Sequence, residues 1–279
     1  NTGNRDFQKL LFLYCIEVEN VPSYEFVPYQ YGGFSFTSYS DRRKLMAKGL
    51  LDNHGNRWQL TKLGRAQAQQ TDKQYHAKME DFVQRVPERG LELVARTYRD
   101  YPYYAIKSTI MEGLELLPEE RARITASAPS KQRPGLLTIG YEGRSLEAYL
   151  NRLLHADVSV LCDVRQNALS RKYGFAKRSL SNATEGVGID YVHMPELGIP
   201  SARRKGLKSA ADYTALFLEY ERETLSQHKN KLQQIRDIVK NGKRVALTCY
   251  EAKSEFCHRS CVAKAVARLD GSALHIQHL

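Results

Sequence analysis

Reactive side chains are concentrated in one short stretch near the end of the chain. Residues 249–251 (Cys-Tyr-Glu) and 257–261 (Cys-His-Arg-Ser-Cys) supply three thiols, an imidazole, a carboxylate and a guanidinium. The apolar run 245–248 before them predicts a short buried strand, and residues 260–269 predict a helix. Loops that follow strands hold the ligands of open α/β sheets. We therefore expect an active or binding site in this loop.

The second half of the chain alternates strand and helix patterns. Strands are predicted at 136–139, 158–162, 189–192 and 245–248, and helices at 145–154, 177–184, 212–241 and 260–269. This alternation predicts a Rossmann-like, mostly parallel, three-layer α/β domain. Polar residues follow each predicted strand, at 140–142, 163–165, 193–196 and 249–251. Because the strand ends of a parallel sheet meet at one edge, we expect these residues to form one site.

Carboxylates and cations at these strand ends suit hydrolysis of a phosphate-containing substrate. Asp163, Glu196 and Glu142 are the candidate acids and bases. Two carboxylates in one site would suit water activation in nuclease or glycosidic-bond hydrolysis. The candidate phosphate contacts are Arg165, Arg171, Lys172, Lys177, His258 and Arg259. The alternative for Asp163 is an internal salt bridge with Arg165 that shapes the loop.

Charge and aromatic residues favour a nucleic-acid partner. The formal net charge is +11, and a basic surface attracts polyanions. Tyr173 and Phe175 are interleaved with the basic run 171–178, and Tyr141 and His193 are further candidates for base stacking or for lining a base pocket. A second basic run contains Arg203, Arg204, Lys205 and Lys208. The alternative is a solvated basic surface without a nucleic-acid partner.

The thiols leave two further hypotheses open. Cys249, Cys257, His258 and Cys261 are of the types that bind zinc, but their spacing lacks the paired knuckles of common zinc fingers and does not favour zinc. A divalent metal held by carboxylates stays open for a nuclease. Cys249 at a strand end also resembles the thiol of rhodanese-like sulfurtransferases, although the acidic residues Glu251 and Glu255 would repel an anion there. A buried, unreactive Cys249 is the other alternative.

The first segment, residues 1–70, has the pattern of a winged helix-turn-helix domain. Helices are predicted around 7–14 and 41–48, followed by a polar turn at 52–56 and a strand at 57–61. The stretch 29–35 is similar to the Y-x-Y-G-P-F-S loop of winged-helix domains, with Gly33 at the usual proline. Arg42, Arg43 and Lys44 would then lie on a recognition helix in the major groove of double-stranded DNA. The alternative is a helical protein-interaction domain with a solvated basic face.

The rest of the chain completes the expected organisation. Residues 71–126 predict a helical connector, 127–135 have linker composition, and 136–279 form the α/β domain. Five cysteines in a long chain argue against a disulfide framework and for a reducing compartment. No apolar run approaches the length of a membrane span, and the first residues show no signal-peptide pattern. We expect a cytoplasmic protein without a membrane partner; the sequence does not determine its oligomeric state.

Several motifs in the second half carry a family resemblance. They are 138–145 (TIGYEGRS), 163–165 (DVR) with Ser170, Arg171, Phe175 and Lys177, 191–198 (YVHMPELG), and Cys249 with 257–259 (CHR). In this order they make residues 136–269 similar to the domain-of-unknown-function 488 family, from which Ala168 departs where proline is usual. The resemblance implies an α/β fold with a site. With a winged helix before it, the architecture resembles prokaryotic nucleic-acid processing or phage-defence proteins.

Together these patterns predict a DNA-directed hydrolase that removes a base or cuts a strand. The competing prediction is a non-catalytic regulator whose α/β domain senses a ligand while the winged helix binds DNA. A sulfurtransferase that depends on Cys249 is the third.

Overall fold

The chain folds into two compact units in a computed structural model that describes residues 2–52, 55–204, 206–269, 271 and 274–279. Unit 1 is Asn1–Ala128 and unit 2 is Pro129–Leu279. The boundary falls inside the predicted linker. Among the described residues, no helix has both the length and the apolar character needed to cross a lipid bilayer.

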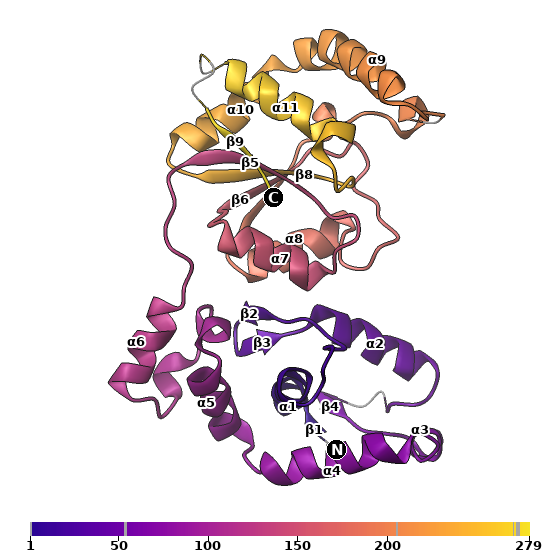
Figure 1. The fold of residues 1–279 in the computed structure, drawn as a ribbon, viewed down its shortest axis with the longest axis vertical. Helices are drawn as coiled ribbons and strands as arrows, with labels where there is room; N and C mark the ends of the chain where they lie inside the picture. The colour runs from indigo at the N-terminus through magenta and orange to yellow at the C-terminus, as the bar shows by residue number, and fades with distance from the viewer. Residues whose placement is uncertain (1, 53–54, 205, 270, 272–273) are drawn as a thin grey trace. The chain divides into compact units, whose positions relative to one another are not determined.

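Unit 1 is mainly helical, with two small antiparallel sheets. Its elements are β1 (Thr2–Gly3), α1 (Asn4–Glu17), β2 (Val27–Tyr29), β3 (Gly32–Phe34), α2 (Phe36–Ala47), β4 (Arg57–Trp58), α3 (Lys62–Ala68), α4 (Lys73–Arg85), α5 (Gly90–Asp100) and α6 (Pro118–Ala126), with 3-10 turns at Pro102–Ala105 and Met111–Gly113. β1 pairs with β4, and β2 pairs with β3. Within this unit α1 lies among the other elements (Figure 1).

The predicted connector shares the core of the predicted winged-helix segment. Phe12 of α1 makes edge-to-face contacts with Phe26 and with Tyr101 and Tyr104 beyond α5. Phe82 of α4 joins the same buried cluster. Because residues from both segments build this one buried cluster, residues 1–70 and 71–126 form one compact body.

The winged helix-turn-helix prediction is not confirmed. That motif needs two consecutive helices joined by a tight turn before the wing, whereas the β2–β3 hairpin lies between α1 and α2. The stretch 29–35 forms most of this hairpin. After α2, Leu51 bridges Leu60 and leads to a short β4, while residues 53–54 of the expected turn lie outside the described residues.

Unit 2 is an α/β domain built on a parallel sheet. Its elements are β5 (Gly135–Gly140), α7 (Leu146–His155), β6 (Val160–Asp163), α8 (Lys177–Gly186), β7 (Asp190–His193), α9 (Ala210–Tyr220), α10 (Lys229–Lys240), β8 (Arg244–Cys249), α11 (Arg259–Arg268) and β9 (Ile276–His278), with a π-helical turn at Glu221–Leu225 and 3-10 turns at Pro195–Leu197, Ser201–Arg204 and Ser254–Phe256. The strand order is β7-β6-β8-β5-β9, with every described pairing parallel. Figure 1 shows α7 and α8 on one face and α10 and α11 on the other. The Rossmann-like, three-layer prediction agrees with this arrangement.

Two elements differ from the predicted pattern. The single helix expected at 212–241 is divided into α9 and α10 by the π-helical turn. A straight helix over this span would extend about 45 Å; instead, the regular hydrogen bonding is interrupted between α9 and α10, and both helices contribute to one core cluster. The edge strand β9 was not predicted, because only three of its residues pair with β5.

The strand order places a topological switch at β8. This strand lies between β5 and β6, but the helix after it covers the opposite face from the helices after its two neighbours (Figure 1). The loops at its carboxyl end therefore diverge and leave a crevice, the position in which open α/β sheets bind ligands.

Candidate functional site

A pocket of about 560 Å³ opens at the carboxyl edge of the unit 2 sheet. We call it the strand-end pocket; its lining residues are Tyr141, Arg165, Asn167, Leu169, Ser170, Arg171, Lys172, Ser201, Arg204, Cys249 and Tyr250. They come from the segments that follow β5, β6, β7 and β8. Three of the four predicted strand ends, 140–142, 163–165 and 249–251, therefore contribute to one pocket, whereas no residue of 193–196 lines it.

The lining of the strand-end pocket is basic. Among the described residues that line it, four have cationic side chains and none has a carboxylate. Arg165 and Arg204 are paired with carboxylates outside the lining, whereas the Nζ of Lys172 donates to the Tyr141 carbonyl oxygen at 3.1 Å and Arg171 is exposed. Partial burial lowers the pKa of Lys172. A lining of this kind favours an anionic ligand.

Asp163 and Arg165 form the internal salt bridge that the sequence left as an alternative. The Asp163 side chain has 0 % exposure, and its Oδ1 accepts from the Arg165 Nε at 2.8 Å. The Tyr191 hydroxyl donates to its Oδ2 at 2.6 Å. Because the carboxylate oxygens are engaged, the geometry favours a structural role for Asp163 over the predicted role in acid or base catalysis.

The other two candidate acids also make protein contacts outside the lining. Glu142 is exposed, and its Oε2 accepts from the Ala252 backbone N–H at 2.9 Å. Glu196 pairs with Lys231 of α10 at 2.9 Å. The pKa of Glu196 is lowered, by its hydrogen bonds with its own backbone and with Lys231. None of the three predicted acids lines the strand-end pocket.

His258 and Arg259 differ from the prediction that they contact phosphate. They are 2 % and 1 % exposed. The guanidinium of Arg259 donates to the backbone oxygens of Glu251 and Ala252, the latter at 3.0 Å. It therefore holds the loop after β8 in place, because the loop backbone already occupies donors that a phosphate would need.

Aromatic residues build the wall of the pocket rather than an open stacking platform. Tyr141 stacks on Phe175 with ring centroids 4.3 Å apart, and both rings are buried. The Nε2 of His193 contacts the Arg165 carbonyl oxygen at 2.8 Å. Tyr173 and Lys177 are exposed but outside the lining, which instead contains the exposed Tyr250. Tyr250 was not predicted as a pocket residue, because in the sequence it stands between Cys249 and Glu251, whose residue types indicate thiol chemistry.

A buried cluster of reactive groups lies behind the pocket wall. Cys249 lines the pocket, although it is only 1 % exposed. Its Sγ lies 3.7 Å from the His258 Nδ1 and 3.3 Å from the Glu251 Oε2. Ligand atoms of Cys249, Cys257 and His258 all lie within 4.8 Å of one another. We call these three residues with Glu251 the thiol cluster.

Hydrogen bonding and burial shift the pKa values of His258 and Glu251 in opposite directions. Burial raises the pKa of Cys257 well above its usual value. For His258, burial opposes the charged form, but contacts with Cys257, the Val164 carbonyl and Glu251 raise its pKa. Burial likewise opposes ionisation of Glu251, yet hydrogen bonds, including those from the two thiols, lower its pKa. The cluster therefore holds the carboxylate of Glu251 beside the protonated thiol of Cys257.

Cys261 is separate from this group. Burial and Glu221 raise the pKa of its thiol to about 12, and it does not belong to the metal-binding set found among the described residues. The four-residue zinc set considered from the sequence is therefore corrected: Cys261 is outside it, and Glu251 lies beside the remaining three.

The predicted DNA contacts of unit 1 lie on or near α2. Arg42 donates to the carbonyl oxygens of Gly55 and Arg57 at 3.1 and 2.8 Å, and Lys44 pairs with Asp41 at 2.9 Å. Arg43 is exposed and makes its own contact. Their role as a recognition surface stays a prediction. Of the second basic run, Lys205 lies outside the described residues.

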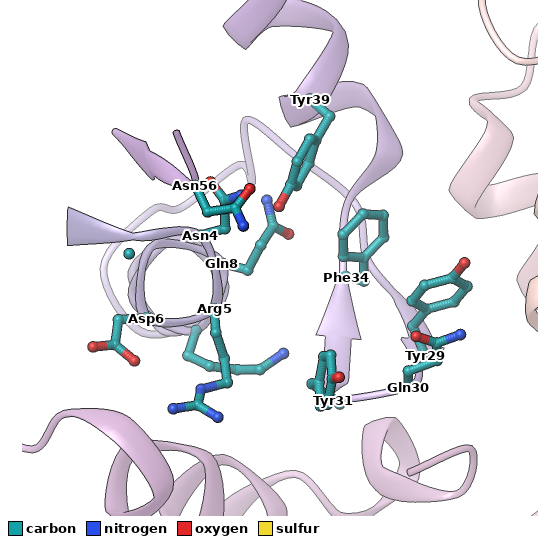
Figure 2. A pocket seen from close by; sticks show the side chains of 13 residues that line it. Asn4, Arg5, Asp6, Gln8, Tyr29, Gln30, Tyr31, Phe34, Tyr39 and Asn56 are labelled. Carbon is teal, nitrogen blue, oxygen red and sulfur yellow. The ribbon is translucent and has the colours of Figure 1, made fainter. Parts of the chain in front are cut away.

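Unit 1 contains a second pocket that sequence reasoning missed. Its volume is about 520 Å³, and α1, the β2–β3 hairpin and α2 contribute to its lining. Figure 2 shows Asn4 and Gln8 of α1 facing Tyr39 and Phe34. Lys9 also lines this pocket while being 2 % exposed, and its Nζ donates to the Gly33 carbonyl oxygen at 2.7 Å. Burial, with a smaller effect of Arg5, lowers the pKa of Lys9 to about 7.

Comparison with known proteins finds a family match within unit 2. Residues 145–266 match the model of the family described as "Domain of unknown function DUF488". No curated protein matches the chain. A solved structure, described as "Putative phosphatase (DUF442) from SHEWANELLA PUTREFACIENS CN-32", is 20 % identical, covers 53 % of this chain and 75 % of its own, and has a TM-score of 0.28. A similarity this low carries no argument about fold or function.

Proposed function

From the chemistry of the strand-end pocket in unit 2, we propose that this chain binds DNA and hydrolyses a bond in it there. The observation that carries the proposal is the lining, whose described residues include four cationic side chains and no carboxylate. Phosphate is the anion that a basic protein with a formal charge of +11 meets on nucleic acid. The exposed Tyr250 in the same lining provides an aromatic face for a base.

The thiol cluster supports a chemical step beside the bound phosphate. Cys249 belongs both to the pocket lining and to the contact with His258 and Glu251. Asp163 is buried in its ion pair, so the reactive groups nearest to the substrate are those of the thiol cluster. Removal of a base and cleavage of the strand are both compatible with this arrangement, and their products differ.

The test compares wild type with Arg171→Ala on plain and base-modified duplex DNA, with and without divalent metal. Arg178→Ala is the matched control, because Arg178 is also exposed but lies outside the lining. Products are resolved before and after alkali. We expect wild type and Arg178→Ala to produce strand cuts or alkali-revealed abasic sites, and Arg171→Ala to produce fewer. A gel shift without products would favour the non-catalytic regulator, and no binding at low salt would refute DNA as the ligand.

A second candidate function is sulfur transfer by Cys249. The observation in its favour is the 3.7 Å contact between the Cys249 Sγ and the His258 Nδ1, which suits thiol activation by an imidazole. Rapid alkylation of Cys249 by iodoacetamide at neutral pH, located by peptide mass analysis, is the expected result. Slow alkylation in the folded, reduced protein would exclude this function.

A further inference from the structure

We infer that Cys249, Cys257 and His258 bind a zinc ion, with the carboxylate of Glu251 beside the fourth coordination position. Two thiolates and an imidazole are a donor set that zinc uses in proteins. The three ligand atoms are already within 4.8 Å of one another. This inference goes beyond the proposed function, because the site would bind zinc whatever the substrate of the pocket.

Two distances from the Cys249 sulfur are close to those between ligand atoms in a tetrahedral zinc site. With zinc–sulfur and zinc–nitrogen bonds of about 2.3 and 2.05 Å, the sulfur and nitrogen atoms of a tetrahedral site are about 3.6 Å apart. The Cys249 Sγ and His258 Nδ1 are 3.7 Å apart. The Glu251 Oε2 lies 3.3 Å from the same sulfur, close to the roughly 3.6 Å expected for sulfur and oxygen ligands. These two pairs need little movement to admit the ion, whereas the Cys257 Sγ, which lies within 4.8 Å of the other two ligand atoms, would move closer by up to about 1 Å.

The second coordination shell also fits zinc. The Nε2 of His258 lies 2.9 Å from the Val164 carbonyl oxygen, an arrangement that requires a proton on Nε2. The lone pair of Nδ1 is then free to face the two thiols, and a hydrogen bond of this kind is usual for metal-bound histidine. The Nη1 of Arg204 pairs with the Glu251 Oε1 at 3.1 Å, which fixes the carboxylate and offsets the negative charge of a site with two thiolates.

The loop that carries the ligands is held in place by packing. Arg259 donates to the backbone oxygens of Glu251 and Ala252. The same part of the loop lies against Gly140, where a Cβ atom would be 1.9 Å from the Glu251 carbonyl oxygen. Such a fixed backbone keeps Cys249 and Cys257 close without a metal. This explains why their sequence spacing, unlike that of a finger, does not disclose the site.

Zinc here would lie at the wall of the strand-end pocket, because Cys249 is part of its lining. A metal in that position can polarise a phosphate oxygen or lower the pKa of a bound water. This consequence rests on the proposed function, whereas zinc binding itself does not.

The experiment measures metal content in the full-length protein, purified under reducing conditions without an affinity tag. Wild type is compared with Cys249→Ser and Cys257→Ser, and Cys261→Ser is the matched control, since Cys261 is also buried but outside the cluster. Mass spectrometry should find about one zinc per chain in wild type and Cys261→Ser, and a loss of about tenfold or more in the other two. Circular dichroism checks that each variant is folded.

Reloading the wild type guards against variants that do not fold. After chelation, the reduced protein is titrated with Co²⁺, which gives visible thiolate-to-metal absorption in a tetrahedral sulfur site. We expect this absorption in wild type and Cys261→Ser, and its displacement by zinc. A folded, reduced wild type that takes up neither metal would refute the inference, as would equal zinc in all four proteins. DNA binding is assayed separately, so failure of the proposed function is distinguishable from failure of the metal site.

Discussion

Replacing Lys9 by methionine should make the stability of unit 1 respond differently to pH. Lys9 is an amine enclosed by protein, with a pKa lowered from 10.5 to about 7 chiefly by burial. Between these two values the unfolded chain holds a proton that the folded chain lacks, so stability rises with pH. Methionine has a similar length and cannot take up a proton. The stability of the Lys9→Met protein should therefore lack this part of the pH dependence.

The size of the effect follows from the pKa change. Each pKa unit corresponds to about 1.4 kcal/mol, so the wild type should gain about 4 kcal/mol relative to Lys9→Met between pH 6 and pH 10. At pH 6 the variant should be the more stable protein. At pH 10 the wild type recovers, because the neutral amine still donates to the Gly33 carbonyl oxygen.

Trp58 provides the assay. It is the single tryptophan of the chain and belongs to unit 1. Its ring stacks on that of Phe7, with the ring centroids 3.6 Å apart. Its fluorescence therefore follows urea unfolding of unit 1 in the full-length protein. Lys78→Met is the control, because Lys78 is exposed on α4, and its free energy of unfolding should stay parallel to wild type. Parallel curves for wild type and Lys9→Met from pH 6 to pH 10 would refute the reasoning.

Three further predictions concern unit 2. Asp163→Asn leaves the Arg165 guanidinium buried without its counter-ion and should lower the free energy of unfolding by about 3–5 kcal/mol in urea, followed by circular dichroism; a change below about 1 kcal/mol would contradict the buried pair. Gly140→Ala places a methyl group against the Glu251 carbonyl oxygen, so it should lower the free energy of unfolding by about 1–3 kcal/mol and reduce the zinc content. An unchanged zinc content would contradict this prediction. Arg171→Ala should reduce the slope of log affinity for DNA against log salt by about one, measured by fluorescence anisotropy, and an unchanged slope would remove Arg171 from the phosphate contacts.

Much of unit 2 could be predicted from the sequence because its pattern is strong. The central strands β5, β6 and β8 contain short apolar runs, and helical apolar spacing follows them. Such regularity predicts a parallel sheet, and a parallel sheet predicts a site at its carboxyl edge. Unit 1 was harder because its strands are only two or three residues long and depend on distant contacts. The β2–β3 hairpin and the burial of Lys9 follow from packing between α1 and residues far along the chain, which periodicity does not record.

The site residues show where prediction from strand ends stops. The sequence predicts that Asp163 and Glu251 lie at the same edge of the sheet, but it does not predict which carboxylate is buried by its protein partners. Asp163 ends β6 beside Arg165 and Tyr191, whose donors occupy its oxygens. Glu251 follows β8 into a loop, where its oxygens meet Cys249 and Arg204. The difference arises from tertiary partners and not from the residue types.

The strand order gives the physical reason why thiols and cations meet at this edge. β8 lies between β5 and β6, yet its chain continues to the opposite face of the sheet (Figure 1). The loop after β8 contacts the ends of both neighbours, with Glu251 against Gly140 of β5 and His258 at the Val164 carbonyl oxygen after β6. Cys249, the last residue of β8, lies beside the basic segment after β6 because β8 pairs with β6. A pocket for an anion and a cluster suited to a metal thus share one wall because one loop spans the switch between the two halves of the sheet.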